Sequence, residues 1–444
     1  MMPRFLVKDA VKHIGEKVRL CGWVNVRRAH GKILFIDLRD ISGVMQVVFV
    51  PSNKEVYELA ETLRPEWVVE IIGQVVKRPE NMVNDKIESG QVEMSVESLK
   101  VLAEAETPPI PVGEENTEEV EIDKRMDWRW IDLRKPKNAL IFEVWTLMEE
   151  SFRKYWTSNN YLEIHSPKLI AAASESGAEV FEVKYFKTKA YLAQSPQFYK
   201  QMAMASGFEK VFEVGPVFRA EPSFTSRHAT EFTGYDAEIS FINSHYDVIE
   251  EEERMIAYGL QQIKEIYGEK IEKMFGREVV VPSVPFPRLS IKEAKAILKK
   301  RKIKNEREGD LSPEEEREVS NYIKEKYGHE FVFVTEYPVS VRPFYHMHDE
   351  KDPTLTKSFD LLWNGLEITT GAQREHRYDV LMKQAKQKGM NVKKLKFYLD
   401  FFKYGCPPHG GYGMGPNRMI MKLFDLDNVR DAMFVYRGVK RLTP

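Results

Sequence analysis

Residues 218–238 place groups that could bind a polyphosphate close together in the chain. Arg219, Arg227 and His228 offer three cationic or potentially cationic side chains within ten residues. Guanidinium groups form paired hydrogen bonds with phosphate oxygens, so this set suits the phosphates of a nucleotide. Phe232 adds a flat apolar face on which a base could stack. The pattern predicts a β-hairpin, and by composition alone a charged surface hairpin without a ligand is equally consistent.

Two other patterns could carry chemistry, but the sequence argues against both. His346 and His348 could chelate a metal, yet alternate residues of a strand point to opposite faces. With no nearby His or Cys to complete a site, structural or surface histidines are the better interpretation. The glycines at 411, 413 and 415 lack both the dinucleotide-binding spacing and the Gly-Lys-Ser/Thr ending of a phosphate-binding loop.

An N-terminal β-rich unit is predicted over residues 17–103. From Val18 to Asn25 apolar and polar residues alternate, which is the period of a half-buried strand. Further elements are expected as strands at 32–39, 44–49, 67–76 and 91–101 and a helix at 53–63. The order β-β-β-α-β-β is that of an OB-fold, a five-stranded barrel that commonly binds oligonucleotides.

A hinge and a larger α+β domain are expected after this unit. Residues 104–123 contain eight acids and no Lys or Arg, which indicates a solvated hinge. From 124 to 444, long helical stretches at about 137–158 and 246–268 alternate with short apolar strands. Residues 285–330 are rich in charge and helical in pattern, so we interpret them as a small insertion.

Composition excludes several classes of protein. The 444 residues include 66 Lys and Arg against 68 Asp and Glu, so nucleic-acid binding would depend on local patches and not on overall charge. An uncharged apolar run of 18 residues is absent, which argues against an ordinary membrane span. The two cysteines, Cys21 and Cys406, are typical of a cytoplasmic chain without disulfides.

The chain resembles class II aminoacyl-tRNA synthetases of the aspartyl, asparaginyl and lysyl subgroup. Residues 218–238 resemble motif 2, and residues 158–167 resemble motif 1, which forms the dimer interface in this family. Residues 411–419 resemble motif 3, and residues 17–50 resemble the family's anticodon-binding OB-fold. The match is collinear over nearly the whole chain. One departure is Asn417, where the family usually has Glu before the Arg.

This resemblance implies an α+β protein with an OB-fold barrel at 1–103, a hinge at 104–123 and a class II catalytic domain at 124–444. That domain would hold an antiparallel sheet flanked by helices. The implied enzyme forms an aminoacyl-AMP from ATP and an amino acid. It then transfers the amino acid to the 3′-terminal adenosine of a tRNA, and it acts as a homodimer.

The resemblance also implies which residues bind ATP and Mg²⁺. Arg219 would bind the α-phosphate and the substrate α-carboxylate, and with Arg418 it would form the catalytic pair. Adenine would stack between Phe232 and Arg418, while Arg227 and His228 would hold the outer phosphates. The implied ATP set is Arg219, Glu221 (at adenine), Arg227, His228, Phe232, Glu367, Gly415 and Arg418, and the implied Mg²⁺ set is Asp360, Glu367 and Thr370.

Residues 194–200 resemble the aspartyl version of the substrate-binding helix. Lys200 would pair with the substrate's side-chain carboxylate, assisted by Arg374, whereas asparagine would leave Lys200 unpaired in a closed site. A solvated helix lysine is the alternative interpretation of Lys200. The implied aspartate-binding set is Glu175, Ser195, Gln197, Lys200, Arg219, Asp236, Thr370 and Arg374.

The short chain resembles compact, archaeal-type enzymes of the aspartyl branch. The implied anticodon-binding set is Arg27, Arg28, His30, Phe35 and Gln46. Phe35 would offer a stacking face, although it could instead belong to the barrel core. The loop at His30 resembles that of enzymes that accept both Asp and Asn anticodons. The expected partner is therefore tRNA(Asp), with tRNA(Asn) as a second partner left open.

Three alternative functions remain to be weighed. An asparaginyl synthetase is opposed by Lys200 and Asp236. An asparagine synthetase derived from the same fold would lack the OB-fold, so residues 17–103 argue against it. A non-catalytic paralogue that only binds RNA or protein should first lose Arg219, Glu367 or Arg418, and this chain retains all three.

Overall fold

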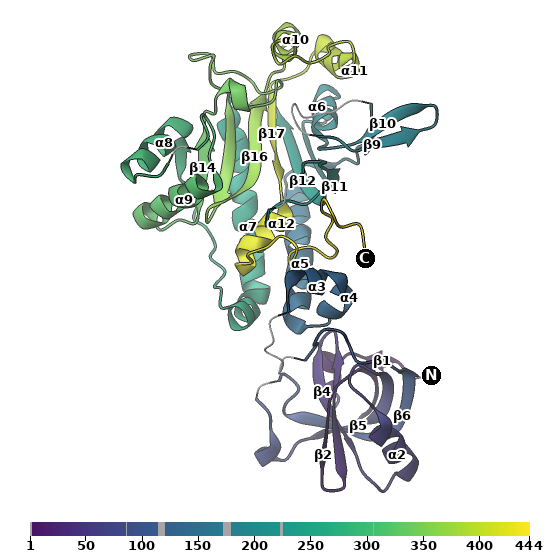
Figure 1. Ribbon diagram of the computed structural model, residues 1–444. Coiled ribbons are helices and arrows are strands. Elements are labelled where there is room, and N and C mark those ends of the chain that lie inside the picture. The colour runs from purple at the N-terminus through teal and green to yellow at the C-terminus, as the bar shows by residue number, and fades with distance from the viewer. Residues whose placement is uncertain (1, 86, 114–119, 172–178, 223–224, 305) are drawn as a thin grey trace. The chain divides into compact units, whose positions relative to one another are not determined.

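The computed structural model describes residues 2–444 except 86, 114–119, 172–178, 223–224 and 305. By its internal contacts the chain divides into two units, Met1–Leu140 with Pro444 and Ile141–Thr443 (Figure 1). This division lies beyond the hinge predicted at 104–123, so the domain boundaries predicted from sequence stay a prediction.

Part of the acidic stretch is packed and not solvated. Ile110 and Val112 are buried in a small cluster with Ile131, and Trp128 packs against it. Ile131 belongs to helix α4 (Arg129–Asp132), which follows α3 (Ile122–Asp127). The apolar residues between the acids therefore anchor this part of the stretch to the two short helices.

The first unit is built on a closed barrel of five strands. Strand β2 pairs with both β3 and β5, and the sheet order β1-β2-β3-β4-β6-β5 closes through the β2–β5 pairing. The predicted order of three strands, a helix and two strands is confirmed. The elements are β1 (Arg4–Phe5), α1 (Val7–Ala10), β2 (Lys17–His30), β3 (Ile33–Asp40), β4 (Gly43–Phe49), α2 (Lys54–Thr62), β5 (Val68–Lys77), the 3-10 turn η1 (Glu80–Met82) and β6 (Val92–Ala103).

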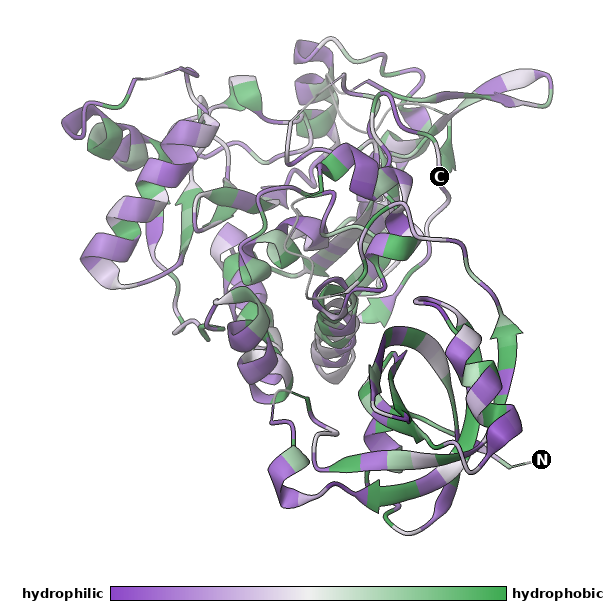
Figure 2. Ribbon diagram, turned by 60° about the horizontal axis from the view of Figure 1, so that its bottom comes forward, coloured by the Kyte–Doolittle hydropathy of each residue, from purple (hydrophilic) through white to green (hydrophobic). Residues whose placement is uncertain are grey.

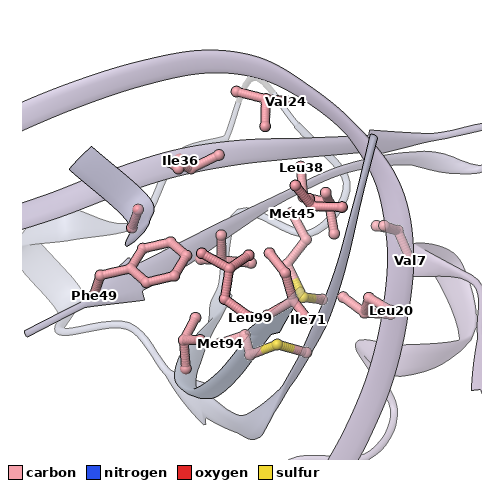
Figure 3. Packing of buried hydrophobic residues seen from close by; sticks show 14 of the residues in the cluster. Val7, Leu20, Val24, Ile36, Leu38, Met45, Phe49, Ile71, Met94 and Leu99 are labelled. Carbon is pink, nitrogen blue, oxygen red and sulfur yellow. The ribbon is translucent and has the colours of Figure 1, made fainter. Parts of the chain in front are cut away.

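The barrel core follows from the period of two along its strands. Val18, Leu20, Gly22 and Val24 are buried, and the residues that alternate with them are partly exposed. The same alternation runs along the barrel strands in Figure 2, and Figure 3 shows Leu20, Val24 and their partners packed inside the barrel. Position 22 belongs to the same buried series. Glycine suits it because a Cβ there would lie 2.3 Å from the carbonyl oxygen of Arg39.

An eight-stranded sheet organises the second unit, in the order β13-β14-β15-β16-β17-β12-β11-β7. Its inner pairs are antiparallel, while β13 and β7 run parallel to their neighbours at the two edges. The strands are β7 (Leu162–Glu163), β11 (Lys210–Phe218), β12 (Glu231–Ser240), β13 (Arg288–Ser290), β14 (Phe331–Thr335), β15 (Ser358–Trp363), β16 (Leu366–Arg374) and β17 (His409–Met414).

Helices flank this sheet, as the α+β prediction requires (Figure 1). α7 packs against β16 and β17, α12 against β12 and β16, and α6 against β11 and β12. The helices are α5 (Pro136–Ser158), α6 (Gln197–Ala205), α7 (His245–Phe275), α8 (Ile291–Lys300), α9 (Pro313–Tyr327), α10 (Tyr378–Gln387), α11 (Lys396–Leu399) and α12 (Pro416–Phe424), with the 3-10 turns η2 (Val339–Val341) and η3 (Asp400–Tyr404). A separate small sheet contains β8 (Leu169–Ile170), β9 (Glu182–Tyr185) and β10 (Thr188–Leu192).

Local signals explain the bounds of α7. Ser244 and Asp247 form a capping box at its start, and Gly276 ends it in the left-handed conformation with φ of 68°. The helix is longer than the predicted 246–268 because its apolar stripe continues to Ile271, which is buried. None of the described helices has the length and apolar composition needed to cross a bilayer.

The insertion predicted at 285–330 forms an edge strand and two helices. β13 extends the sheet beside β14, while α8 and α9 pack against each other and on β14. Val319 and Ile323 of α9 lie in one core cluster with Val332 and Val334 of β14. The insertion therefore shares the core of the second unit.

Two isoleucines of the barrel unit, one in β3 and one in the turn after it, test the inward alternation. Ile36 is 0% exposed in the barrel core, whereas Ile41 is 74% exposed. Ile36→Ala should lower the free energy of unfolding of the barrel by about 2–5 kcal/mol. Hydrogen–deuterium exchange of the β3 amides in the full chain measures this locally. Ile41→Ala is the matched control, with an expected change within about 0.5 kcal/mol; equal effects of the two variants would contradict the burial pattern.

Candidate active site

A cavity opens on the central strands of the second unit. Its walls come from β11, β12, β16 and β17, from the loop between β11 and β12, and from the start of α12. The predicted site residues that line it are Ser195, Arg219, Glu221, Arg227, His228, Phe232, Asp236, Glu367, Thr370, Gly415 and Arg418.

The register of three antiparallel strands brings distant residues together. Gly413 of β17 lies opposite Asp236 of β12 on one side and opposite Thr370 of β16 on the other. A Cβ on Gly413 would lie 3.1 Å from Oδ1 of Asp236. Gly413 therefore keeps room for the Asp236 carboxylate, as Gly411 does for that of Glu238.

Arg219 directly follows β11. Its backbone N–H donates to the carbonyl of Thr230 at 2.9 Å, which extends the β11–β12 pairing by one residue. Its guanidinium carbon lies 5.5 Å from the centre of the Phe232 ring. Nε of Arg219 is buried without a hydrogen-bond partner among the described residues. An unsatisfied guanidinium nitrogen facing a cavity suits an anionic ligand.

Arg418 stands in the first turn of α12, where Pro416 starts the helix. Its Nη1 donates to the backbone carbonyl of Glu367 at 2.8 Å and lies 3.4 Å from Oε1 of the same residue. Asn417 instead points to the carbonyl of Ala432, at 3.4 Å from Nδ2. Asn417 stands where the family usually has Glu, and Arg418 donates its hydrogen bonds to Glu367 of β16.

The outer end of the cavity carries Arg227 and His228. Nη1 of Arg227 donates to Oε2 of Glu316 at 2.8 Å. Nδ1 of His228 is hydrogen-bonded to the Thr225 hydroxyl. Burial and the neighbouring charge of Arg418 lower the pKa of His228. The neutral imidazole can therefore donate or accept a hydrogen bond here.

Asp360 and Thr370 lie opposite each other on β15 and β16, with Glu367 nearby. Oδ2 of Asp360 accepts from Arg342 at 2.6 Å, whereas its Oδ1 is buried without a partner among the described residues. The Thr370 hydroxyl donates to Glu367 at 3.3 Å. Burial raises the pKa of Asp360, whereas the charges of Arg418, Arg342 and Arg219 outweigh burial and lower the pKa of Glu367. These hard oxygen donors, one of them unsatisfied, fit Mg²⁺.

Lys200 is completely buried and lies behind the cavity wall. Its Nζ is 2.9 Å from Oδ1 of Asp236 and 3.4 Å from Oε2 of Glu238, and it donates to the carbonyl of Tyr412 at 2.9 Å. The alternative of a solvated helix lysine is therefore wrong. Lys200 is joined to the cavity through Asp236, which lines it.

Arg374 is buried beside the same acids. Its Nε donates to Oε1 of Glu238 at 2.9 Å, and its Nη2 donates to the carbonyl of Gly411 at 2.8 Å. Its Nη1 lies 3.1 Å from Nε2 of His346. Burial and Arg374 lower the pKa of His346, so the ring is neutral and accepts this hydrogen bond. His346 is thus a structural histidine, and no group of three or more His, Cys, Asp or Glu side chains that could hold a metal ion occurs among the described residues.

The charge inventory predicted from sequence needs a correction. It set Lys200 and Arg374 against one substrate carboxylate, but Glu238 already pairs with both. Asparagine would therefore not leave Lys200 without a counter-charge. Glu238 and His346 are partners of Lys200 and Arg374 that the sequence reasoning missed, although Glu238 lies in the hairpin and His346 in a noted pair. Which residues they would face was not visible from spacing.

Three further predicted aspartate-binding residues have different outcomes. Ser195 lines the cavity, and its hydroxyl accepts from the backbone N–H of Gln197 at 3.3 Å. Gln197 is buried at the start of α6, and its Nε2 donates to Oε1 of Gln201 at 3.1 Å. Glu175 lies outside the described residues, so its predicted role stays a prediction.

One outer face of the barrel holds most of the predicted anticodon residues. Arg28 lies opposite Phe35 across β2 and β3, and His30 is two residues further along the same face. Phe35 is half-buried, whereas its neighbours Leu34 and Ile36 enter the core, so the core alternative for Phe35 is wrong.

The acids on this barrel face were not predicted. Arg28 donates to Asp37 at 2.8 Å, and Nε2 of Gln46 donates to Glu93 at 2.7 Å. Arg27 is separated from the others because successive residues of a strand face opposite sides. Its guanidinium donates to the carbonyl of Glu61 in α2.

Family models match most of the chain. Residues 121–436 match the class II tRNA synthetases (D, K and N), and residues 18–102 match the OB-fold nucleic acid binding domain. Among curated relatives, the aspartate–tRNA(Asp/Asn) ligase of Aeropyrum pernix is 42% identical over 97% of this chain and 96% of its own. The aspartate–tRNA(Asp) ligase of Pyrococcus horikoshii is 39% identical, with 97% of each chain covered.

Solved structures agree on the fold over the full chain. The asparaginyl-tRNA synthetase of Pyrococcus horikoshii, complexed with asparaginyl-adenylate, is 33% identical with a TM-score of 0.91 and 100% coverage of both chains. The aspartyl-tRNA synthetase of Entamoeba histolytica is 31% identical with a TM-score of 0.88, covering 100% of this chain and 93% of its own. With these matches over the antiparallel sheet and the OB-fold barrel, the chain belongs to the class II aminoacyl-tRNA synthetases of the D, K and N group.

Proposed function

We propose that this enzyme is an aspartate–tRNA ligase. The observation that carries the proposal is the buried cluster of Lys200, Arg374, Asp236 and Glu238, which meets the cavity through Asp236. The full-length relatives named above as aspartate–tRNA ligases support it. Asparaginyl enzymes share the fold closely, so the choice of amino acid depends on the charges of this cluster.

The cavity suits the first reaction step. An oxygen of the aspartate α-carboxylate would attack the α-phosphorus of ATP, forming aspartyl-AMP and releasing pyrophosphate. Arg219 is placed to neutralise the carboxylate and the α-phosphate as they approach, and Arg418 and Phe232 would hold adenine. In the second step a ribose hydroxyl of the 3′-terminal adenosine attacks the aspartyl carbonyl, and AMP leaves.

Net charge would select aspartate over asparagine. Two cations and two acids make the cluster neutral before the substrate binds. Aspartate adds an ammonium and a side-chain carboxylate, which cancel, and its α-carboxylate goes to Arg219. The ammonium would form an ion pair with Asp236. The side-chain carboxylate of the substrate would then replace Asp236 as the partner of Lys200. Asparagine would add the ammonium alone and leave a buried positive charge, which is strongly unfavourable.

Mg²⁺ would bind between ATP and the residues Asp360, Glu367 and Thr370. The unsatisfied Oδ1 of Asp360 and the neighbouring Glu367 carboxylate support this site. When bound, the ion would neutralise phosphate charge. Arg342 fixes the Asp360 carboxylate from its other oxygen and thereby orients the unsatisfied one.

A homodimer is proposed from the segment at 158–167, which resembles the family's interface motif. Its strand β7 lies at the edge of the sheet, where Leu162 is 52% exposed. A nearby groove on the same unit is lined by Phe142, Trp145 and Phe434, and Phe434 is 67% exposed. An exposed edge strand with apolar neighbours suits pairing with a second copy. Its tRNA and ATP substrates support a cytoplasmic location.

His30 is proposed to admit both tRNA(Asp) and tRNA(Asn). The two anticodons differ only at their last base, which is C or U. His30 is exposed at the end of β2, on the face that carries Arg28 and Phe35. An imidazole can present a donor or an acceptor, so it can meet the amino group of C or the carbonyl of U. This chain is similar both to a relative named for tRNA(Asp) and to one named for tRNA(Asp/Asn). Sequence identity alone therefore does not decide which tRNAs it accepts.

Pyrophosphate exchange tests the amino-acid choice. With ATP, Mg²⁺ and no tRNA, aspartate should support exchange, and asparagine should support it at least about 100-fold less well, because asparagine gives the buried cluster a net positive charge. Lys200→Met should abolish the aspartate reaction. Exchange with asparagine but not with aspartate would overturn the proposed function.

Loss of either arginine in the ATP site should abolish activation. Arg219→Ala and Arg418→Ala each remove a cation from the cavity and should reduce the exchange rate by about 100-fold or more. Arg254→Ala, on the half-exposed side of α7, is the matched control and should keep wild-type exchange. Near-normal exchange in either site variant would show that the ATP site is misplaced.

Aminoacylation of purified tRNAs tests the anticodon proposal. The wild-type enzyme should aspartylate tRNA(Asp) and tRNA(Asn) at comparable rates. His30→Leu should favour tRNA(Asp), by up to the ~1–3 kcal/mol that one misread base typically costs. Pyrophosphate exchange should stay unchanged in this variant, because it needs no tRNA. A wild-type preference above about 100-fold for tRNA(Asp), or about 2.7 kcal/mol, would refute relaxed reading.

A further inference from the structure

The insertion contributes one buried acid to the nucleotide end of the active site. Glu316 lies in the first turn of α9, where Ser312 and Glu315 form a capping box. The Ser320 hydroxyl of the same helix accepts from the backbone N–H of Gly365 at 2.8 Å. Gly365 lies in the turn that leads into β16, which carries Glu367. The helix is thus fixed to the strand that supplies the proposed metal ligand.

Glu316 pairs with an arginine of the cavity. Its Oε2 accepts from Nη1 of Arg227 at 2.8 Å, across 89 positions of sequence. The Glu316 side chain is 7% exposed and that of Arg227 is 18% exposed. Arg227 lines the cavity together with Arg219 and Arg418. Arg227, the proposed ligand of the outer phosphates, is therefore already paired with a carboxyl group from the insertion.

This ion pair conflicts with a bound triphosphate. The outer phosphates of ATP would need the same guanidinium, and their charges would stand close to the Glu316 carboxylate. Two like charges in a partly desolvated site repel strongly. Arg227 would therefore exchange one anionic partner for the other when ATP binds, and would exchange back when pyrophosphate leaves.

We propose that Glu316 is a positioning residue that holds Arg227 in place until the outer phosphates of the nucleotide displace it. This inference rests on the proposed function, since it takes Arg227 as a ligand of the outer phosphates. It gives the insertion a role in nucleotide binding. Because Glu316 re-forms its pair with Arg227 when the outer phosphates depart, it also favours release of pyrophosphate.

Nucleotide binding measured by calorimetry tests the proposal without an amino acid. Glu316→Gln keeps the size of the side chain and removes its charge, so it should tighten ATP binding roughly five- to twentyfold. AMP has no outer phosphates, and its affinity should change less than about twofold. Glu316→Asp keeps the charge on a shorter side chain and should give a smaller change for ATP.

Two controls separate this role from a general effect of the insertion. Glu318→Gln makes the same substitution on α9, where Glu318 pairs with Arg301 instead, and should leave both affinities unchanged. In an Arg227→Ala background, Glu316→Gln should tighten ATP binding less than it does in the wild type, because only the repulsion between Glu316 and the phosphates is then removed. Unchanged or weaker ATP binding in Glu316→Gln would overturn the proposal, and so would an equal change for AMP.

The outcome is separable from the test of the proposed function. If the wild-type enzyme fails to exchange pyrophosphate with aspartate, the amino-acid assignment fails, yet the comparison of ATP with AMP still reports on Arg227. Thermal unfolding of each variant shows whether it is folded. If Glu316→Gln does not fold, Glu316→Asp decides, and unchanged ATP affinity in that variant would then overturn the proposal.

Discussion

The cancellation of four buried charges is the constraint on which the active site depends. Lys200, Arg374, Asp236 and Glu238 are all buried, with Asp236 reaching the cavity, and each cation is within hydrogen-bonding distance of an acid. Removing one partner of such a group costs about 3–5 kcal/mol because the remaining charge stays buried. A site of this kind accepts a ligand readily when the ligand adds no net charge. It is therefore the charge of the substrate, more than its shape, that this arrangement is suited to discriminate.

At the proposed nucleotide site, arginines are likewise paired with acids, but these pairs are less deeply buried. Arg342 pairs with Asp360, Arg418 with Glu367 and Arg227 with Glu316, so each of these arginines has a resident acid. Arg219 differs, because its Nε has no hydrogen-bond partner in the described part of the chain. A resident acid keeps an arginine in position without a ligand, and it must be displaced or shared when phosphates arrive. These pairs connect the sheet, α12 and the insertion, which explains how a segment far from the sequence motifs can influence nucleotide binding.

In the barrel, strand geometry places the predicted anticodon residues on two different faces. Arg28, His30 and Phe35 share the outer face because they are in register across β2 and β3, while Leu34 and Ile36 fill the core. Arg27 is next to Arg28 in sequence but contacts α2. Asp37 and Glu93 hold Arg28 and Gln46 in defined positions. The face is therefore an ordered surface of aromatic, basic and amide groups, and such surfaces suit single-stranded RNA.

The sequence by itself determined the order of elements in the barrel, because a period of two and turn residues are local signals. It likewise determined the hairpin around Arg219, whose two strands are β11 and β12. Only the tertiary structure decided which charges meet. Glu238 is 136 positions from Arg374, and Glu316 is 89 positions from Arg227. Such pairs depend on sheet order and on the packing of an insertion, and neither is encoded in local spacing. The physical reason is that side-chain electrostatics act through space over a few ångströms, whereas sequence patterns report only what neighbouring residues do.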